Sequence, residues 1–241
     1  MCRSTSDPTS LNRLRKRMLQ PVVVASLGFS LIAAFGVLGV VTSLRPEFGS
    51  GLFDLDGEFR LYAILHGEAG RLESYNVPTL YSSALSAFAA VVAATLGRAE
   101  GVHLVRWFIF TGVLAHMAID ELLQIHERLE RLSGVSWQTL YIPMFVLAAV
   151  VWWRVMRQLE PKARVLLMLG AAMWAVSQSL EHMEWLAEGR RAPHYNVMMA
   201  PEELMEMIGS LLFLLAMLVA RETLLLERGN HQRGNVTKAK V

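Results

Sequence analysis

The chain has 241 residues, of which 54% are hydrophobic and 18% are charged. A typical soluble domain is about 25% charged and roughly 45–50% apolar, so this excess of apolar residues indicates a chain that is partly embedded in lipid. The same composition excludes a disordered chain and a nucleic-acid-binding arm. Cys2 is the only cysteine, which excludes internal disulfides and a zinc–thiolate cluster.

Six apolar stretches predict helices that cross a bilayer, a distance that takes about 20 residues. The first, Pro21 to Leu44, contains no charge and follows a basic segment. It is longer than the apolar region of a cleaved signal peptide, so it predicts an uncleaved anchor. The remaining stretches run from Val77 to Leu96, from Arg106 into Asp120, from Leu140 to Trp153, from Val165 to about Leu180, and from about Glu206 to Ala220.

Three of these stretches, the third, fifth and sixth, meet acidic residues at one end. The helical pattern continues through the acids, so we interpret all three as full-length helices with polar ends. Lysine and arginine give the orientation, because they gather on the cytoplasmic side of a membrane protein. With the N-terminus inside, sixteen of the 23 basic residues lie on that side. We therefore expect an all-α, six-helix transmembrane bundle, N-in/C-in, in the cell inner (plasma) membrane, with the lipid bilayer as its partner.

The predicted parts of the chain follow from these spans. Residues 1–20 form a cytoplasmic basic arm, residues 21–222 the six-span membrane domain, and residues 223–241 a cytoplasmic tail. An outer loop covers residues 45–76. Within it, residues 58–66 have helical spacing of apolar side chains, which predicts a helix on the membrane surface.

The net charge of +2 hides a separation of charge between the two faces. Sixteen of the 21 acidic residues lie on the outer side or in the outer ends of helices. Orientation does not require this, since aspartate and glutamate contribute little to it. The acids gather in three segments, AIDELLQIHERLE at the end of the third span, SLEHMEW at the end of the fifth, and PEELMEMIGS at the start of the sixth. Such an excess suggests a cation site.

Three of these acids are expected below the outer interface. Counting helix rise from the cytoplasmic arginine of each span places Asp120 at about 21 Å, Glu206 at about 22 Å and Glu181 at about 26 Å, in a hydrocarbon core about 30 Å thick. A carboxylate at a helix centre costs roughly 2.5–3.5 kcal/mol, and the spans offer no lysine or arginine as a partner. Each acid therefore needs a proton, a bound metal, or polar neighbours, of which the sequence offers Gln124, Ser177 and Tyr141.

Helix spacing extends this set. His116, Asp120, Gln124 and Glu127 fall on one helical face, and Gly209 with Ser210 predicts close helix approach one turn below Glu206. Facing helices that carry Glu and His inward build metal sites in bundles. We predict a divalent metal ion held by Asp120, Glu181 and Glu206, with further candidate ligands at His116, Glu121, His126, His182, Glu184 and Glu203. Imidazole with carboxylates suits zinc, iron or manganese, whereas carboxylates alone suit magnesium, calcium or manganese.

Three motifs carry a family resemblance. The third span ends in a DExxxxHE pattern (Asp120 to Glu127), the next span carries W-x-x-L-Y-I-P, and the last carries E-E-L-M-E-M-I-G. Together they resemble a pattern in uncharacterised bacterial multi-pass membrane proteins, over roughly residues 104–222. The resemblance supports the architecture and implies no particular activity.

The sequence leaves three functions open. The first is a metal-dependent enzyme that hydrolyses or oxidises a lipid-like or small-molecule ligand from the outer side. In such an enzyme the metal would activate water or oxygen, and a neighbouring carboxylate would act as general base. The second is a proton- or cation-coupled transporter, which also needs buried acids without basic partners. The third is a non-catalytic membrane assembly or sensor subunit.

Overall fold

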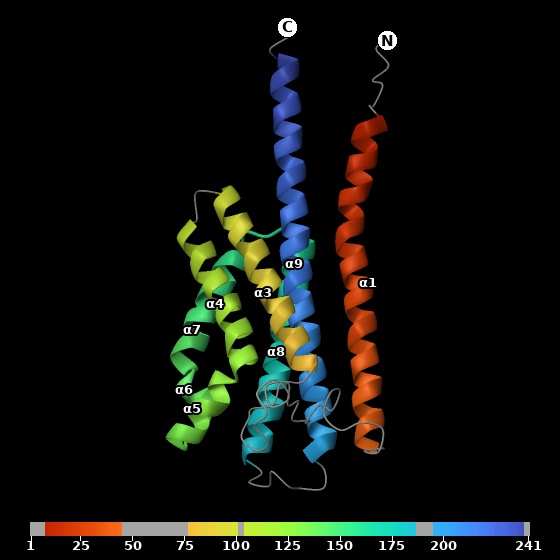
Figure 1. Ribbon diagram of the computed structural model, residues 1–241. Coiled ribbons are helices and arrows are strands. Elements are labelled where there is room, and N and C mark those ends of the chain that lie inside the picture. Colours follow the sequence, from red (N-terminus) through yellow and green to blue (C-terminus); the bar gives the residue numbers. More distant parts are fainter. Residues whose placement is uncertain (1–7, 45–76, 101–103, 187–194, 239–241) are drawn as a thin grey trace, which may run out of the picture.

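A computed structural model describes residues 8–44, 77–100, 104–186 and 195–238, and all regular structure in these ranges is α-helical (Figure 1). The all-α class is therefore confirmed. The surface helix predicted at residues 58–66 lies outside the described residues. The helices are α1 (Pro8–Leu44), α3 (Val77–Glu100), α4 (Leu104–Leu123), α5 (Ile125–Ser133), α6 (Trp137–Leu140), α7 (Ile142–Met156), α8 (Pro161–Leu186) and α9 (Tyr195–Lys238).

Four of these helices are long and apolar enough to cross a membrane. The qualifying segments are Gln20–Leu38, Pro78–Ala99, Pro161–Met183 and Pro201–Arg228. They coincide with the first, second, fifth and sixth predicted spans. α7 is apolar but has only 15 residues, and α4 carries Arg106, Asp120 and Glu121 within its 20 residues. Length and composition therefore identify four membrane-type helices, not six, in the described part of the chain.

The helices extend beyond the predicted membrane boundaries. α1 begins at Pro8, inside the predicted arm, and α9 continues to Lys238, inside the predicted tail. Both of those ends lie at the same end of the bundle, opposite α5 and α6 (Figure 1). Many large apolar side chains on the outside are exposed, among them Val105, Phe108 and Val146. An exposed apolar surface of this kind suits contact with lipid.

α9 is the central helix of the bundle. It packs against α8, α3 and α1, while α3 packs against α4 and α4 against α7 (Figure 1). Leu211 and Met217 of α9, Ala93 of α3 and Leu167 of α8 are fully buried in the shared core. α4 and α9, the third and the last predicted spans, therefore both pack on α3. The acidic end of α4 and the acidic start of α9 lie at the same end of the bundle (Figure 1).

Glycine allows α8 and α9 to approach closely. A β-carbon added at Gly209 would lie 2.5 Å from Cδ1 of Trp174 and 3.1 Å from the carbonyl oxygen of Gly170. A β-carbon at Gly170 would lie 2.8 Å from Cδ1 of Phe213. Neither position has room for a side chain, so the close approach predicted at Gly209 is confirmed.

The helix of the third span does not continue through its acidic end as predicted. α4 ends at Leu123, and Gln124 takes a left-handed conformation with φ 48° and ψ 45° before α5 begins at Ile125. The common face predicted for His116, Asp120, Gln124 and Glu127 is therefore wrong beyond Gln124. The break bends the chain, so that the start of α5 reaches the carboxylate of Asp120, which accepts a hydrogen bond from the backbone N–H of His126 at 3.1 Å.

Candidate metal site

Three glutamates form a compact cluster at the acidic end of the bundle. Glu121 comes from the last turn of α4, and Glu203 and Glu206 are separated by one turn near the start of α9. One carboxylate oxygen from each lies within 4.8 Å of the other two. Glu206 is only 7% exposed. Glu121 keeps part of its side chain exposed, while its carboxylate lies within the buried cluster.

The carboxylate of Glu206 is oriented by α8. Oε1 of Glu206 accepts hydrogen bonds from the hydroxyl of Ser177 at 3.0 Å and from the amide Nε2 of Gln178 at 3.2 Å. Ser177 is completely buried. The close α8–α9 packing brings these donors within reach, so Glu206 is held in one place. The sequence predicted Ser177 as a polar neighbour of the acids, and this contact confirms it.

Asp120 belongs to a second group, beside the glutamate cluster. Its Oδ2 lies 2.8 Å from Nδ1 of His126, and its Oδ1 accepts a hydrogen bond from the hydroxyl of Tyr141 at 2.8 Å. Asp120 itself is 8% exposed. The carboxylate thus accepts bonds from the start of α5 and from the junction of α6 and α7. The predicted role of Tyr141 as a polar neighbour is confirmed.

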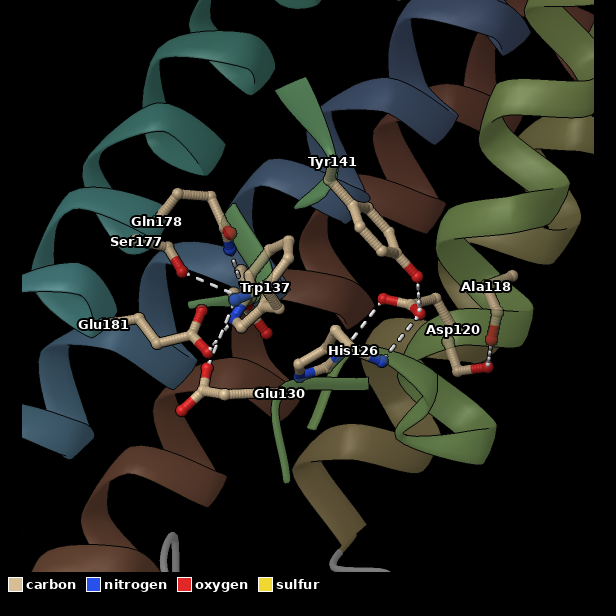
Figure 2. Close-up of polar contacts among 11 residues, drawn as sticks. Ala118, Asp120, His126, Glu130, Trp137, Tyr141, Ser177, Gln178 and Glu181 are labelled. Atoms are coloured by element: carbon tan, nitrogen blue, oxygen red, sulfur yellow. Dashed lines mark hydrogen bonds and ion pairs between the residues drawn. The ribbon is translucent and has the colours of Figure 1, made fainter. Parts of the chain in front are cut away.

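Trp137 joins this second group to α8. Its ring lies 4.8 Å from the ring of His126 and 5.3 Å from that of Tyr141, measured between centroids. Its Nε1–H donates to Oε1 of Glu181 at 2.5 Å, and its backbone N–H donates to Oε2 of Glu130 at 3.3 Å. Figure 2 shows His126 and Trp137 between Asp120 on one side and Glu181 on the other.

The two groups are close enough to act on each other. The carboxylate of Glu121 interacts electrostatically with Asp120 and Glu181 as well as with the two glutamates of its own cluster. His126 interacts electrostatically with Glu206. The acidic ends of α4, α8 and α9 therefore converge in space, which depth counting along separate helices had left open.

The remaining predicted candidates are spread around this centre. The ring of His116 lies 5.6 Å from that of Tyr141, and its Nε2 is buried without a hydrogen-bond partner. His182 is half-buried on α8, next to Glu181. Glu184 belongs to α8, but its side chain lies outside the described set. Of the nine predicted ligands, the compact cluster contains Glu121, Glu203 and Glu206.

Sequence reasoning did not identify Trp137, Glu130 and Gln178 as parts of this region. Trp137 begins the W-x-x-L-Y-I-P motif, and its distance of four residues from Tyr141 was the available signal, because that spacing places both rings on one side of a helical turn. Glu130 and Gln178 gave no comparable signal. Their contacts depend on the turn at Gly134, which follows α5, and on the α8–α9 packing.

The glutamate cluster combines features that suit a cation. Three carboxylate oxygens supply the hard ligands that Mg²⁺, Ca²⁺ and Mn²⁺ prefer. Between Tyr195 and Arg221, α9 carries no lysine or arginine. No basic residue of the same helix therefore lies near Glu203 or Glu206. An arrangement of this kind fits a divalent metal ion.

Comparison with known families gives one match. The family described as a domain of unknown function (DUF8692) matches residues 31–220. Neither the curated proteins nor the solved structures gave a match. The matched segment holds the glutamate cluster, the Asp120–His126 pair, two of the four membrane-type segments in full, and parts of the first and the last. Because it covers well over half of the sequence, the chain belongs to the DUF8692 family.

Proposed function

We propose that this chain is an integral protein of the cell inner (plasma) membrane that binds a divalent cation at its outer side. The membrane part of the proposal is supported by the four apolar helices and by the bias of lysine and arginine toward one side. α4 and α7 complete a six-span bundle with both termini in the cytoplasm. A reporter enzyme that is active only in the periplasm, fused at Val241, should then be inactive.

The observation that carries the cation site is the distance between the three glutamates. Carboxylate oxygens from α4 and α9 come within 4.8 Å of one another in a buried cluster. Two unit charges 4 Å apart repel each other by about 4 kcal/mol at an effective dielectric constant of 20, and burial adds a desolvation cost. Such a cluster persists only if protons or a cation compensate its charge. A divalent ion compensates two charges at once and uses the same oxygens as ligands.

A specific observation weighs against a transport path through the bundle. One turn below Glu206, the hydroxyls of Ser86 and Ser210 are 3.1 Å apart, and the indole N–H of Trp174 donates to Ser210 at 3.3 Å. Further along α9, the buried side chains among the described residues are apolar, including Leu211, Leu214 and Met217. On the buried face of α9, polar groups therefore stop one turn below Glu206, which favours a site open to one side.

Metal analysis of the purified protein tests this proposal. Full-length protein in detergent should bind one equivalent of Mn²⁺ after removal of metals with EDTA and dialysis. Glu206→Gln and Glu203→Gln should each weaken binding at least tenfold, whereas Glu227→Gln, an exposed glutamate on the same helix, should not. Wild-type protein that binds no divalent ion would refute the proposal.

The ligand of such a site separates the remaining alternatives. A lipid-like molecule reaching the site from the outer leaflet is our proposed substrate class, with metal-assisted hydrolysis or oxidation as the chemistry. Mn²⁺ or proton flux into proteoliposomes that is lost in Glu206→Gln would favour the transporter instead. Stoichiometric metal without flux or turnover would favour the assembly or sensor subunit.

A further inference from the structure

A buried serine hydroxyl gives independent support for a ligand at the glutamate cluster. Ser82 of α3 is 1% exposed, and its Oγ has no hydrogen-bond partner among the described residues. α3 and α9 run in the same direction (Figure 1), and Ser86 contacts Ser210 between them. Ser82 lies four residues before Ser86, as Glu206 does before Ser210, so both occupy the next turn of the same faces. Ser82 therefore lies on the face of α3 that packs against α9, at the level of Glu206.

A second unsatisfied atom belongs to Gln178. Its Nε2 donates to Glu206, while its Oε1 is buried without a hydrogen-bond partner. Buried polar atoms nearly always have a partner, and an unpartnered one costs about 1–3 kcal/mol. A cation bound at the three carboxylates, or water bound to that cation, would satisfy these two oxygens. The cluster therefore has the surroundings of a ligand site.

The Asp120–His126 pair has the arrangement that orients a metal-binding histidine. Such a histidine binds the metal through one ring nitrogen and donates its other N–H to a carboxylate or carbonyl oxygen. Here Nδ1 of His126 is 2.8 Å from Oδ2 of Asp120, which directs Nε2 away from Asp120. Tyr141 and the backbone of His126 hold Oδ1 of the same carboxylate, and the ring of Trp137 packs against that of His126 at 47°. These contacts hold the imidazole at the start of α5, where its charged form would attract the carboxylate of Glu206.

We propose that His126 supplies a nitrogen ligand to the glutamate site and that Asp120 orients it, which makes the site selective for a first-row transition metal over Mg²⁺ and Ca²⁺. This inference rests on the proposed function. Imidazole favours transition metals, whereas sites of oxygen alone suit the hard cations Mg²⁺ and Ca²⁺. The three glutamates place their oxygens within 4.8 Å of one another. His126 lies outside that cluster, bonded to Asp120, the residue directly before Glu121, so the imidazole would complete the ligand set from the start of α5.

Pulsed EPR of the Mn²⁺-loaded, full-length protein tests the inference. The wild-type spectrum should show coupling to a directly bound imidazole nitrogen. His126→Gln should remove this coupling and weaken Mn²⁺ binding by about 10–100-fold, while Ca²⁺ binding changes much less. His231→Gln, in the C-terminal part of α9, should change neither. A hundredfold excess of Ca²⁺ should displace Mn²⁺ from His126→Gln and leave it on the wild-type protein.

A second variant covers the case in which His126→Gln does not fold. Asp120→Asn keeps an oxygen that can accept the Nδ1–H bond, so it should retain the nitrogen coupling and weaken Mn²⁺ binding less than loss of the histidine does. Mn²⁺ bound without nitrogen coupling, or coupling lost in His182→Gln but kept in His126→Gln, would overturn the inference and leave the proposed function standing. Absence of any divalent metal would overturn both.

Discussion

The indole N–H of Trp137 donates to the carboxylate of Glu181 at 2.5 Å, across 44 positions in the sequence. This bond links the start of α6 to the acidic end of α8. α4 and α7 pack on each other, and α8 packs on α9, so the two helix pairs meet at the site through side chains such as these. The ring of the same tryptophan packs against that of His126 at 4.8 Å and 47°, so the residue that links α6 to α8 also contacts a candidate ligand.

Trp137→Phe tests how much this link stabilises the protein. The substitution keeps an aromatic ring against His126 and Tyr141 but removes the donor to Glu181. A hydrogen bond to a charged group contributes about 1.5–3 kcal/mol, so the free energy of unfolding should fall by that amount. Reversible unfolding in mixed detergent micelles measures it. Trp153→Phe, an exposed tryptophan on α7, serves as the control, and equal losses in the two variants would contradict the prediction.

Gly209→Ala should destabilise the α8–α9 pair. The added methyl group would lie 2.5 Å from Cδ1 of Trp174, and overpacking of this kind costs about 1–3 kcal/mol. Gly112→Ala provides the matched control, because a β-carbon there meets nothing within 4 Å. In a helix interior, that change should stabilise by roughly 0.5–1 kcal/mol. Thermal unfolding in one detergent compares them, and a Gly209→Ala protein as stable as Gly112→Ala would exclude the close contact.

The sequence was most informative where one helix alone decides the outcome. The all-α class follows from composition and apolar run length, and the close approach at Gly209 follows from a small residue one turn from an acid. The break at Gln124 could not be predicted, because glutamine is a good helix former and the apolar spacing continues past it. The rotation of α4 about its own axis could not be predicted from the sequence either. Asp120 and Glu121 are adjacent, but they point about 100° apart on the helix, one to His126 and the other to the glutamates of α9.

The left-handed residue Gln124 offers a way to move His126 without changing its chemistry. A β-branched side chain is disfavoured at positive φ, whereas asparagine tolerates it. Gln124→Val should therefore lower the free energy of unfolding by about 1–2 kcal/mol, and Gln124→Asn should lower it less. Because the turn delivers the backbone N–H of His126 to Asp120, Gln124→Val should also weaken Mn²⁺ binding. Calorimetric titration with Mn²⁺ checks this, and unchanged affinity in a destabilised variant would show that the turn does not position the histidine.

Glu121→Gln separates the effect of the glutamate cluster on folding stability from its effect on metal binding. Without divalent metal, removing one carboxylate from three that lie within 4.8 Å relieves repulsion, so the variant should melt at a higher temperature than the wild type in EDTA. With Mn²⁺ at about 100 times its Kd, the wild type should gain about 2.7 kcal/mol. The variant should gain much less, because it lacks a ligand. The order of the two melting temperatures should therefore reverse when metal is added.

Glu227→Gln should follow the wild type in both buffers. A structural cluster stabilised by shared protons would show no reversal, since EDTA and Mn²⁺ would leave its charge unchanged. The crossing of the two stabilities thus distinguishes a cation site from a group of acids that only packs together.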